Sequence, residues 1–348
     1  MRCEKIALSF LSVLIFVGTA RADFVSDSEN LRKRLFAGTE SKASCSVLSR
    51  GPYVNLKDTD AGLDSFVSDF LTKLKGKDAK VLPLFHDRLR LKADFGEQLY
   101  SSLKQTYKEP WDFSVFRIFG LNTVNGDKQD LPCADEDVLV TTAYGYPFQV
   151  GVWIQLLSQS ELGRIFAVVA PTKDGWKIVG LHMQQWTQSE KDFEAWIKQS
   201  NDYAAKGTPH LAYLSLDVSQ KMLFGGDLLT FPLVNAIIAE RDKIMTKEAL
   251  RKKIGAFFPD RDIAYAGTAL AEDGPGWVIR ERITQEKPTN ELMKRCLEAG
   301  KKLQMEGWIS KNLGGLNCNY VLPGEAAEKP GKLGGFYFSQ KDILTKKL

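Results

Sequence analysis

Three histidines, His86, His182 and His210, carry the side chains that would titrate near neutral pH. No two of them have the spacing that places zinc ligands on one helix face. The chain also lacks a phosphate-binding loop ending in Gly-Lys-Ser/Thr, a Gly-x-Gly-x-x-Gly segment after a strand, and a Gly-x-Ser-x-Gly nucleophile elbow. We therefore predict no metal site, no cofactor and no catalytic residue.

His182 is the histidine best suited to a ligand site. Side chains alternate between the two faces of a strand, so the predicted strand 176–184 presents His182 and Gln184 on one face. By the same alternation, Trp153 and Gln155 share one face of a neighbouring apolar strand. If the two faces coincide and point into the fold, they line a mostly apolar cavity with a few polar anchors. We predict Trp153, Gln155, His182 and Gln184 as ligand-binding residues; the alternative is a sheet surface that faces solvent.

Acid–base catalysis in this cavity is disfavoured by the composition of the strands. The strand interiors 150–157 and 165–170 contain no Asp, Glu or His, although proton transfer needs a titratable group beside the substrate. A lone His182 can hydrogen-bond a ligand, but turnover normally requires a positioned partner as well. The sequence therefore favours binding without catalysis.

Four cysteines, Cys45, Cys133, Cys296 and Cys318, follow the amino-terminal region. An even number in an exported chain favours disulfides, and four cysteines permit three connectivities. Neighbours in sequence are the simplest partners, so we expect Cys45–Cys133 and Cys296–Cys318. The alternative of Cys318 as a nucleophile on a glycine-rich loop has no supporting signature around it.

The amino terminus has the pattern of a secretory signal peptide, which we assign to residues 1–22. A basic start is followed by an apolar run from Ile6 to Gly18 and by the small residues Ala20 and Ala22. The run is shorter than a membrane-spanning helix requires, although a retained membrane anchor remains the alternative. No Asn-x-Ser/Thr acceptor is present, which favours bacterial export, to the periplasm or outside the cell.

Composition bounds the class of protein. The 348 residues are 44% hydrophobic and 26% charged, which is ordinary for a globular chain and excludes disordered and polytopic membrane proteins. The formal net charge of +4 is small, and basic runs such as 251–253 are short. We therefore expect no nucleic-acid partner and no stable membrane insertion after signal cleavage.

The spacing of apolar residues divides the chain beyond residue 22 into several segments. An extended lead-in covers 23–60, and helical spacing then predicts helices at 63–74, around 81–85 and at 95–107. Strands rich in β-branched and aromatic residues follow at 113–121, 138–146, 150–157, 164–170 and 176–184. Short turns join these strands, so we predict an antiparallel meander and an α+β fold.

Residues 61–187 resemble the NTF2-like, or cystatin-like, superfamily. The residues that carry the resemblance are Phe66, Phe70, Leu74, Gly76, Asp78, Leu84, Phe85 and the closing segment Asp174-Gly-Trp-Lys-Ile-Val-Gly-Leu-His182. The resemblance implies a cone of helices packed on a curved antiparallel sheet. Enzymes of this superfamily place carboxylates or histidines on the concave face, and this chain departs from that pattern.

The remainder is predicted as a helical region, 188–260, and a small α+β segment, 261–348. One helix pair in the first region resembles a tetratricopeptide repeat, but a solenoid needs at least three repeats. The second region should begin with a hairpin, 263–270 and 277–283, followed by a helix at 290–304. Neither region shows a motif that indicates a function.

Three functions remain open at this level. The favoured one is an exported, non-enzymatic protein that binds a small ligand or a protein partner through the NTF2-like domain. The first alternative is a cofactor-free lyase, isomerase or hydrolase that uses His182 as a base. The second is a structural or assembly factor of the cell envelope, whose partner would be an envelope protein.

Overall fold

The computed structural model describes residues 32–33, 35–39, 41–50, 61–78, 80–133, 137–159, 161–271, 274–284, 287–309, 313–329, 331 and 333–346. The predicted signal peptide, 1–22, lies outside this range. Two compact units divide the described chain, and the fold class is α+β as predicted. Unit 2 holds the chain up to Trp186 together with Leu223–Val234, and unit 1 holds Thr187–Met222 and the chain from Asn235 onward. No helix among the described residues is long and apolar enough to cross a membrane.

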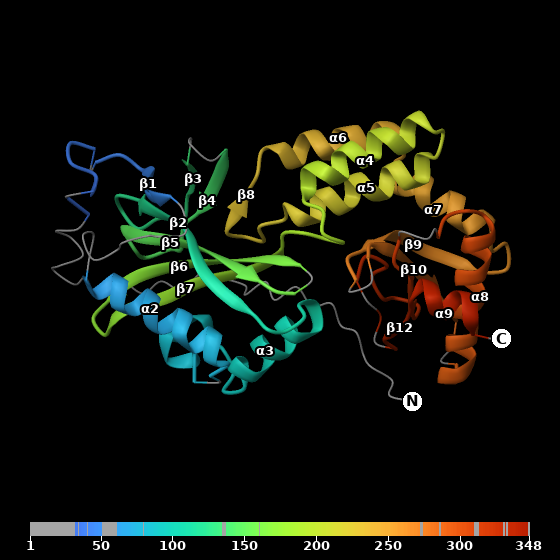
Figure 1. Ribbon diagram of the computed structural model, residues 1–348, viewed down its shortest axis with the longest axis horizontal. Coiled ribbons are helices and arrows are strands. Elements are labelled where there is room, and N and C mark those ends of the chain that lie inside the picture. Colours follow the sequence, from blue (N-terminus) through green and yellow to red (C-terminus); the bar gives the residue numbers. More distant parts are fainter. Residues whose placement is uncertain are drawn as a thin grey trace. The chain divides into compact units, whose positions relative to one another are not determined.

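Unit 2 is built on a five-stranded antiparallel sheet with the order β1-β2-β5-β6-β7 (Figure 1). Its strands are β1 (Ser44–Arg50), β2 (Asp112–Asn122), β5 (Phe148–Leu157), β6 (Leu162–Thr172) and β7 (Gly175–Gln185). Strands β5, β6 and β7 are consecutive and joined by short turns, which is the meander that the sequence predicts.

Helices cover one face of this sheet. They are α2 (Ala61–Gly76), the short 3-10 turns η1 (Leu82–Leu84) and η2 (Asp87–Leu89), and α3 (Phe95–Thr106), which lie below the sheet in Figure 1. Leu63, Phe70 and Leu74 recur at helical spacing and are fully buried. They form one hydrophobic core with the strand residues Ile154 and Ile165. The helices therefore occupy the face of the sheet to which Ile154 and Ile165 point.

A small second sheet packs against the other face. It has the order β3-β4-β8 and consists of β3 (Asp130–Cys133), β4 (Val138–Thr141) and β8 (Leu229–Thr230). Its apolar side chains share a core with Phe119, Trp153 and Phe166 of the large sheet. Strand β8 arrives from a segment far along the chain, because Leu223–Val234 belongs to unit 2.

Two sequence predictions about this unit are wrong in detail. The predicted strand 138–146 is not part of the meander: β4 is short and pairs with β3 and β8 instead. Strand β2 instead pairs directly with β5, and β1, from the lead-in, adds to the other edge of β2. The β1–β2 and β4–β8 pairings join segments remote in sequence, so local patterns carried no information about these partners.

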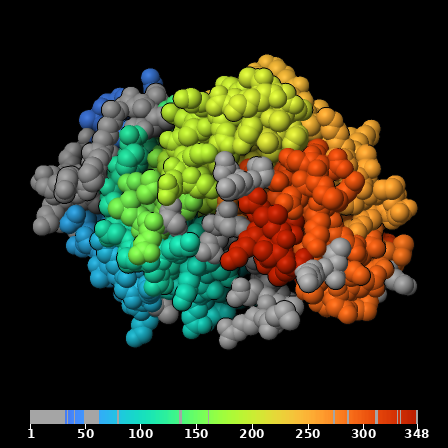
Figure 2. Space-filling model, turned by 45° about the vertical axis from the view of Figure 1, so that its right-hand side comes forward, coloured from blue at the N-terminus to red at the C-terminus, as the bar shows by residue number. Residues whose placement is uncertain are grey.

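Unit 1 begins with helices. They are α4 (Phe193–Ala205), α5 (Pro209–Met222), α6 (Leu233–Ile244), whose first two residues belong to unit 2, and α7 (Lys247–Ala256). Helices α4 and α5 lie side by side, and their residues form a continuous yellow-green surface in Figure 2. The side chain of Asp192 caps α4 by accepting a hydrogen bond from the backbone N–H of Ala195 at 2.9 Å.

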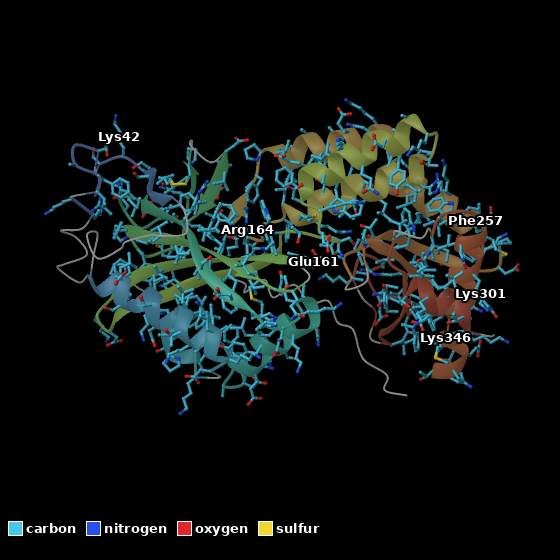
Figure 3. All side chains as sticks on the ribbon, in the orientation of Figure 1. Lys42, Glu161, Arg164, Phe257, Lys301 and Lys346 are labelled. Atoms are coloured by element: carbon cyan, nitrogen blue, oxygen red, sulfur yellow. A yellow bond between two sulfur atoms is a disulfide. The ribbon has the colours of Figure 1, made fainter. Side chains whose placement is uncertain are left out.

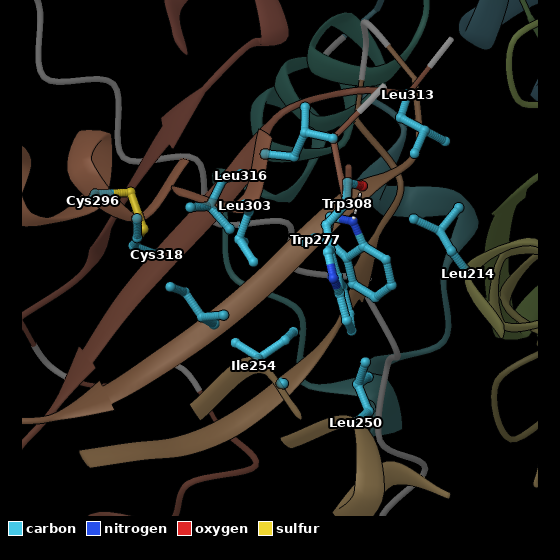
Figure 4. Packing of buried hydrophobic residues seen from close by; sticks show 14 of the residues in the cluster. Leu214, Leu250, Ile254, Trp277, Cys296, Leu303, Trp308, Leu313, Leu316 and Cys318 are labelled. Atoms are coloured by element: carbon cyan, nitrogen blue, oxygen red, sulfur yellow. Dashed lines mark hydrogen bonds between the residues drawn. A yellow bond between two sulfur atoms is a disulfide. The ribbon is translucent and has the colours of Figure 1, made fainter. Parts of the chain in front are cut away.

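A four-stranded sheet with the order β12-β11-β10-β9 completes unit 1. Its elements are β9 (Asp262–Ala269), β10 (Gly276–Arg282), α8 (Thr289–Met305), β11 (Leu316–Val321), β12 (Gly335–Phe338) and α9 (Gln340–Thr345). Strands β9 and β10 form the predicted antiparallel hairpin, whereas β10 and β11 are parallel and need the crossover that α8 provides. The predicted helical and carboxy-terminal segments thus pack as one unit around one hydrophobic core (Figure 4).

Both predicted disulfides are present. Cys45–Cys133 joins β1 to β3 in unit 2, and Cys296–Cys318 joins α8 to β11 in unit 1. The second bridge lies in the core that also holds Trp277 (Figure 4). Each disulfide therefore links two elements of the same unit.

Candidate functional site

The register of unit 2 brings the four predicted ligand-binding residues to one face of the sheet. Trp153 pairs with Phe166, which pairs in turn with His182. One step along, Gln155, Arg164 and Gln184 form a parallel row, again in direct register. Directly paired residues, and residues two apart on a strand, point to the same side of a sheet. The two faces that the sequence analysis identified therefore coincide.

The face that these residues share is not the face that the helices cover. The helices cover the face that carries Ile154 and Ile165, and Trp153 points to the opposite side, into the core beneath the β3-β4-β8 sheet. Strand alternation determines which residues share a face, but it does not determine which face the helices cover. The sequence could not make that choice, because both faces of β5 and β6 are apolar.

The side chain of His182 packs inside unit 2. Its side chain is buried, and its Nε2 atom donates a hydrogen bond to the carbonyl oxygen of Phe224 at 2.9 Å. A β-carbon added to Gly226 would lie 2.5 Å from the other ring nitrogen, Nδ1, so this nitrogen lies against the backbone of the same segment. Burial lowers the pKa of His182, which favours the neutral ring. This geometry fixes the 223–234 segment to the sheet and leaves neither nitrogen facing an open cavity.

Trp153 lies at the centre of a cluster of aromatic rings. Its ring contacts Phe116, Trp186 and Phe231 with centroid separations of 6.0, 6.2 and 6.1 Å. The residue is only 3% exposed, and its indole N–H finds no hydrogen-bond acceptor among the described residues. A buried donor without an acceptor is uncommon in folded proteins and calls for an explanation.

Arg164 is the feature that the sequence analysis missed. It lies on β6, where it pairs with Gln155 of β5 on one side and Gln184 of β7 on the other. Figure 3 labels it together with Glu161. Its guanidinium carbon Cζ lies 2.9 Å from the ring centroid of Trp186, 4.6 Å from that of Trp153 and 5.1 Å from that of Phe116. We call these four residues, Arg164, Trp153, Trp186 and Phe116, the arginine cluster.

No carboxylate described in the structure forms an ion pair with Arg164. Its contacts in the described chain are the three rings of the arginine cluster, and the charged group that acts on it most is another cation, Arg117. Burial first, and then the charge of Arg117, lower the pKa of Arg164 below its ordinary range. Asp112, one row further along the same face, is held by Lys75 at 2.8 Å. The cluster is thus a partly desolvated cation that lacks an anion.

The face is buried at one end and open at the other. Trp153, Phe166 and His182 are buried. By contrast, Gln155 and Arg164 are partly exposed, as is Phe116. The row of Arg164 and Gln155 therefore lies toward the open end of this face.

The chemistry of the arginine cluster is that of binding. A guanidinium presents several N–H donors in a planar fork that matches the two oxygens of a carboxylate or phosphate. The three rings surround it, and Gln155 adds an amide that can donate or accept. A search of the described residues finds no group of three His, Cys, Asp or Glu side chains that could hold a metal ion.

A weak sequence signal for this site did exist. Arg164 is a charged residue at the start of a predicted strand whose interior is otherwise apolar, opposite Gln155. Only acids and histidines, the residues that transfer protons, were considered as catalytic residues in the interiors of these strands. Trp186 and Phe116 could not be joined to Arg164 without the register.

Comparisons of the chain with protein-family models, with curated proteins and with solved structures found no match. The resemblance of residues 61–187 to the NTF2-like superfamily therefore stays a prediction.

Proposed function

We propose that this chain is an exported, non-enzymatic binding protein whose unit 2 holds a small anionic ligand at the arginine cluster. The observation that carries the proposal is the partly buried Arg164 guanidinium, which lies among three rings and forms no ion pair with a described carboxylate. Removing a charge from water is unfavourable unless a partner compensates for it. A ligand that brings one or two oxygen acceptors would supply that partner.

The aromatic rings support the same interpretation. They attract the cation by about 0.5–2 kcal/mol per favourable contact, which helps to retain it at a partly dry position. Trp153 and Trp186 lie at 87° to each other, so they contact the guanidinium in two different planes and restrict its orientation. The indole N–H of Trp153 adds a second donor, which has no acceptor among the described residues.

Export is supported by the cysteines. The two disulfides are of the kind that form and persist in oxidising compartments, and the amino terminus has the pattern of a signal peptide. The enzymatic alternative would use His182 as the base, but its Nε2 donates to the carbonyl oxygen of Phe224 and its Nδ1 lies close to Gly226. Binding is therefore the better supported function.

Titration of the chain from Asp23 onward with acetate, benzoate and inorganic phosphate tests the proposal. Trp153 and Trp186 contact Arg164, so their fluorescence should report binding, with calorimetry as a second readout. We expect saturable binding of at least one anion and a loss of affinity of about tenfold or more in Arg164→Gln, since a charge-assisted hydrogen bond contributes about 1.5–3 kcal/mol.

Arg280→Gln is the matched control. Arg280 is also a partly buried arginine over a ring, 4.4 Å from the centroid of Tyr265, but it lies in unit 1 and donates to the carbonyl of Ala327. This variant should leave anion affinity unchanged. Equal affinity in the parent protein and in folded Arg164→Gln, or no binding of any of the three anions, would contradict the proposed function.

A further inference from the structure

The open end of the sheet face also carries leucines beside Arg164. Leu157 pairs directly with Leu162, and these residues lie two positions from Gln155 and Arg164 on their respective strands. Leu157, Leu162, Gln155 and Arg164 therefore share one face. Leu157 is 39% exposed, which is unusual for a large apolar side chain in a strand of this sheet.

The distance between the two rows suits a single ligand. Residues two apart on a strand are separated by about 6.6 Å, at roughly 3.3 Å per residue. An anionic group at the guanidinium would thus leave a neighbouring part of the same molecule over Leu157 and Leu162. Phe116 is partly exposed beside Arg164 and adds to the apolar surface of Leu157 and Leu162.

We propose that the ligand is an amphiphilic anion, a free single-chain carboxylate whose charged end binds Arg164 and whose apolar body lies along Leu157 and Leu162. This inference rests on the proposed function. It commits to a monomeric carboxylate because the cationic feature is local: the guanidinium of Arg164 in the arginine cluster, and that of Arg117, which lies 4.7 Å from the ring centroid of Phe116. A single exposed leucine is normal on a protein surface and does not indicate a binding site. Here two leucines lie in register beside a cation that has no ion pair among the described residues, which favours a ligand with both an apolar and an anionic part.

The expected signature is a rise of affinity with chain length. Acetate, butanoate, hexanoate and octanoate carry the same charged group and differ only in methylenes. Each methylene that leaves water contributes about 0.8 kcal/mol, so affinity should rise by up to about fourfold per methylene until the chain outgrows the leucine row. Octanol, which has the same body without the charge, should bind at least tenfold more weakly than octanoate.

Leu157→Ser is the variant that isolates the apolar part. Because Leu157 is already well exposed, the change should leave folding intact while it flattens the dependence on chain length. Acetate affinity should be unaffected, since Arg164 is retained. Leu344→Ser, at a leucine 58% exposed in unit 1, is the matched control and should keep the full dependence.

Two failures are distinguishable. If acetate and octanoate bind equally well and both depend on Arg164, the amphiphile inference is wrong and the anion site stands. A second outcome is that affinity rises along the carboxylate series but is the same in folded Arg164→Gln, or that octanol binds as tightly as octanoate. The anionic end then does not bind at Arg164, and both the inference and the proposed function are wrong.

Discussion

Arg241 and Arg295 of unit 1 and Arg164 of unit 2 have opposite electrostatic surroundings. In unit 1, Arg241 is almost fully buried and bonds Asp217 at 2.7 Å, and Arg295 forms an ion pair with Glu281, whose side chain is 5% exposed. In unit 2, Arg164 is enclosed by three aromatic rings and forms no ion pair in the described chain. The first two arginines stabilise the fold through ion pairs, whereas Arg164 can bind an anionic ligand.

Unit 1 shows how completely a buried charge can be compensated. Asp217 accepts hydrogen bonds from Arg241, Lys221 and Thr268 at 2.7, 2.7 and 2.5 Å. Burial by itself would raise the pKa of Asp217, but Lys221, Thr268 and Arg241 outweigh it and lower the pKa to about 2. These contacts tie α5, α6 and β9 to one carboxylate, so the network is structural.

Asp217→Ala should give the largest effect. The change leaves Arg241 and Lys221 without their shared acceptor in a buried position, and breaking such a pair costs about 3–5 kcal/mol of unfolding free energy. Asp242→Asn is the control, because Asp242 also bonds Arg241 but is far more exposed, and it should cost about 1 kcal/mol or less. Urea denaturation followed by circular dichroism measures both. Equal losses in the two variants would break the comparison between the units.

Acidification should weaken both units moderately. Burial lowers the pKa of His86 and His182 in unit 2 and of His210 in unit 1. The unfolded chain takes up protons as the pH falls below about 6.5, while the folded chain resists them, so unfolding free energy falls from pH 7 to pH 5. Thermal unfolding across this range measures it, and His182→Gln should show a shallower dependence. A melting temperature that rises on acidification would contradict the assignment of neutral, buried histidines.

Arg164→Met should have the smallest effect on stability. Loss of the cation over three rings is unfavourable, whereas removal of a partly desolvated charge is favourable, and the two contributions oppose each other. We expect unfolding free energy within about 1 kcal/mol of the parent. The same change at Arg241 should cost about 3 kcal/mol or more, since it deprives Asp217 of a buried donor. A loss at Arg164 as large as that at Arg241 would mean that Arg164 has a structural role.

Local sequence patterns predicted those features that depend on neighbours along the chain. Strand alternation correctly grouped Trp153 with Gln155 and His182 with Gln184, and proximity in sequence gave the right pairing for Cys296 and Cys318. The remaining features depend on contacts between distant segments. The return of Leu223–Val234 to unit 2 closes the face over His182, and nothing in that segment indicates its destination.

The candidate site shows the same limit more sharply. Its rings come from three places in the chain, with Phe116 at an irregularity in β2, Trp153 within β5 and Trp186 just after β7. Each is, by itself, an ordinary core aromatic residue. Only the register between the strands places them around Arg164, and register is a property of the folded sheet.

The most direct test of the central claim observes the Arg164 side chain during binding. In a nitrogen-15 NMR spectrum of the arginine side chains, the Nε–H signal of Arg164 is assigned as the one lost in Arg164→Lys. Titration with octanoate should shift this signal saturably, while the Nε–H signal of Arg241, which is held by Asp242 at 3.1 Å, stays in place. An Arg164 signal that does not move in the folded protein, at octanoate concentrations that saturate binding elsewhere, would contradict the account.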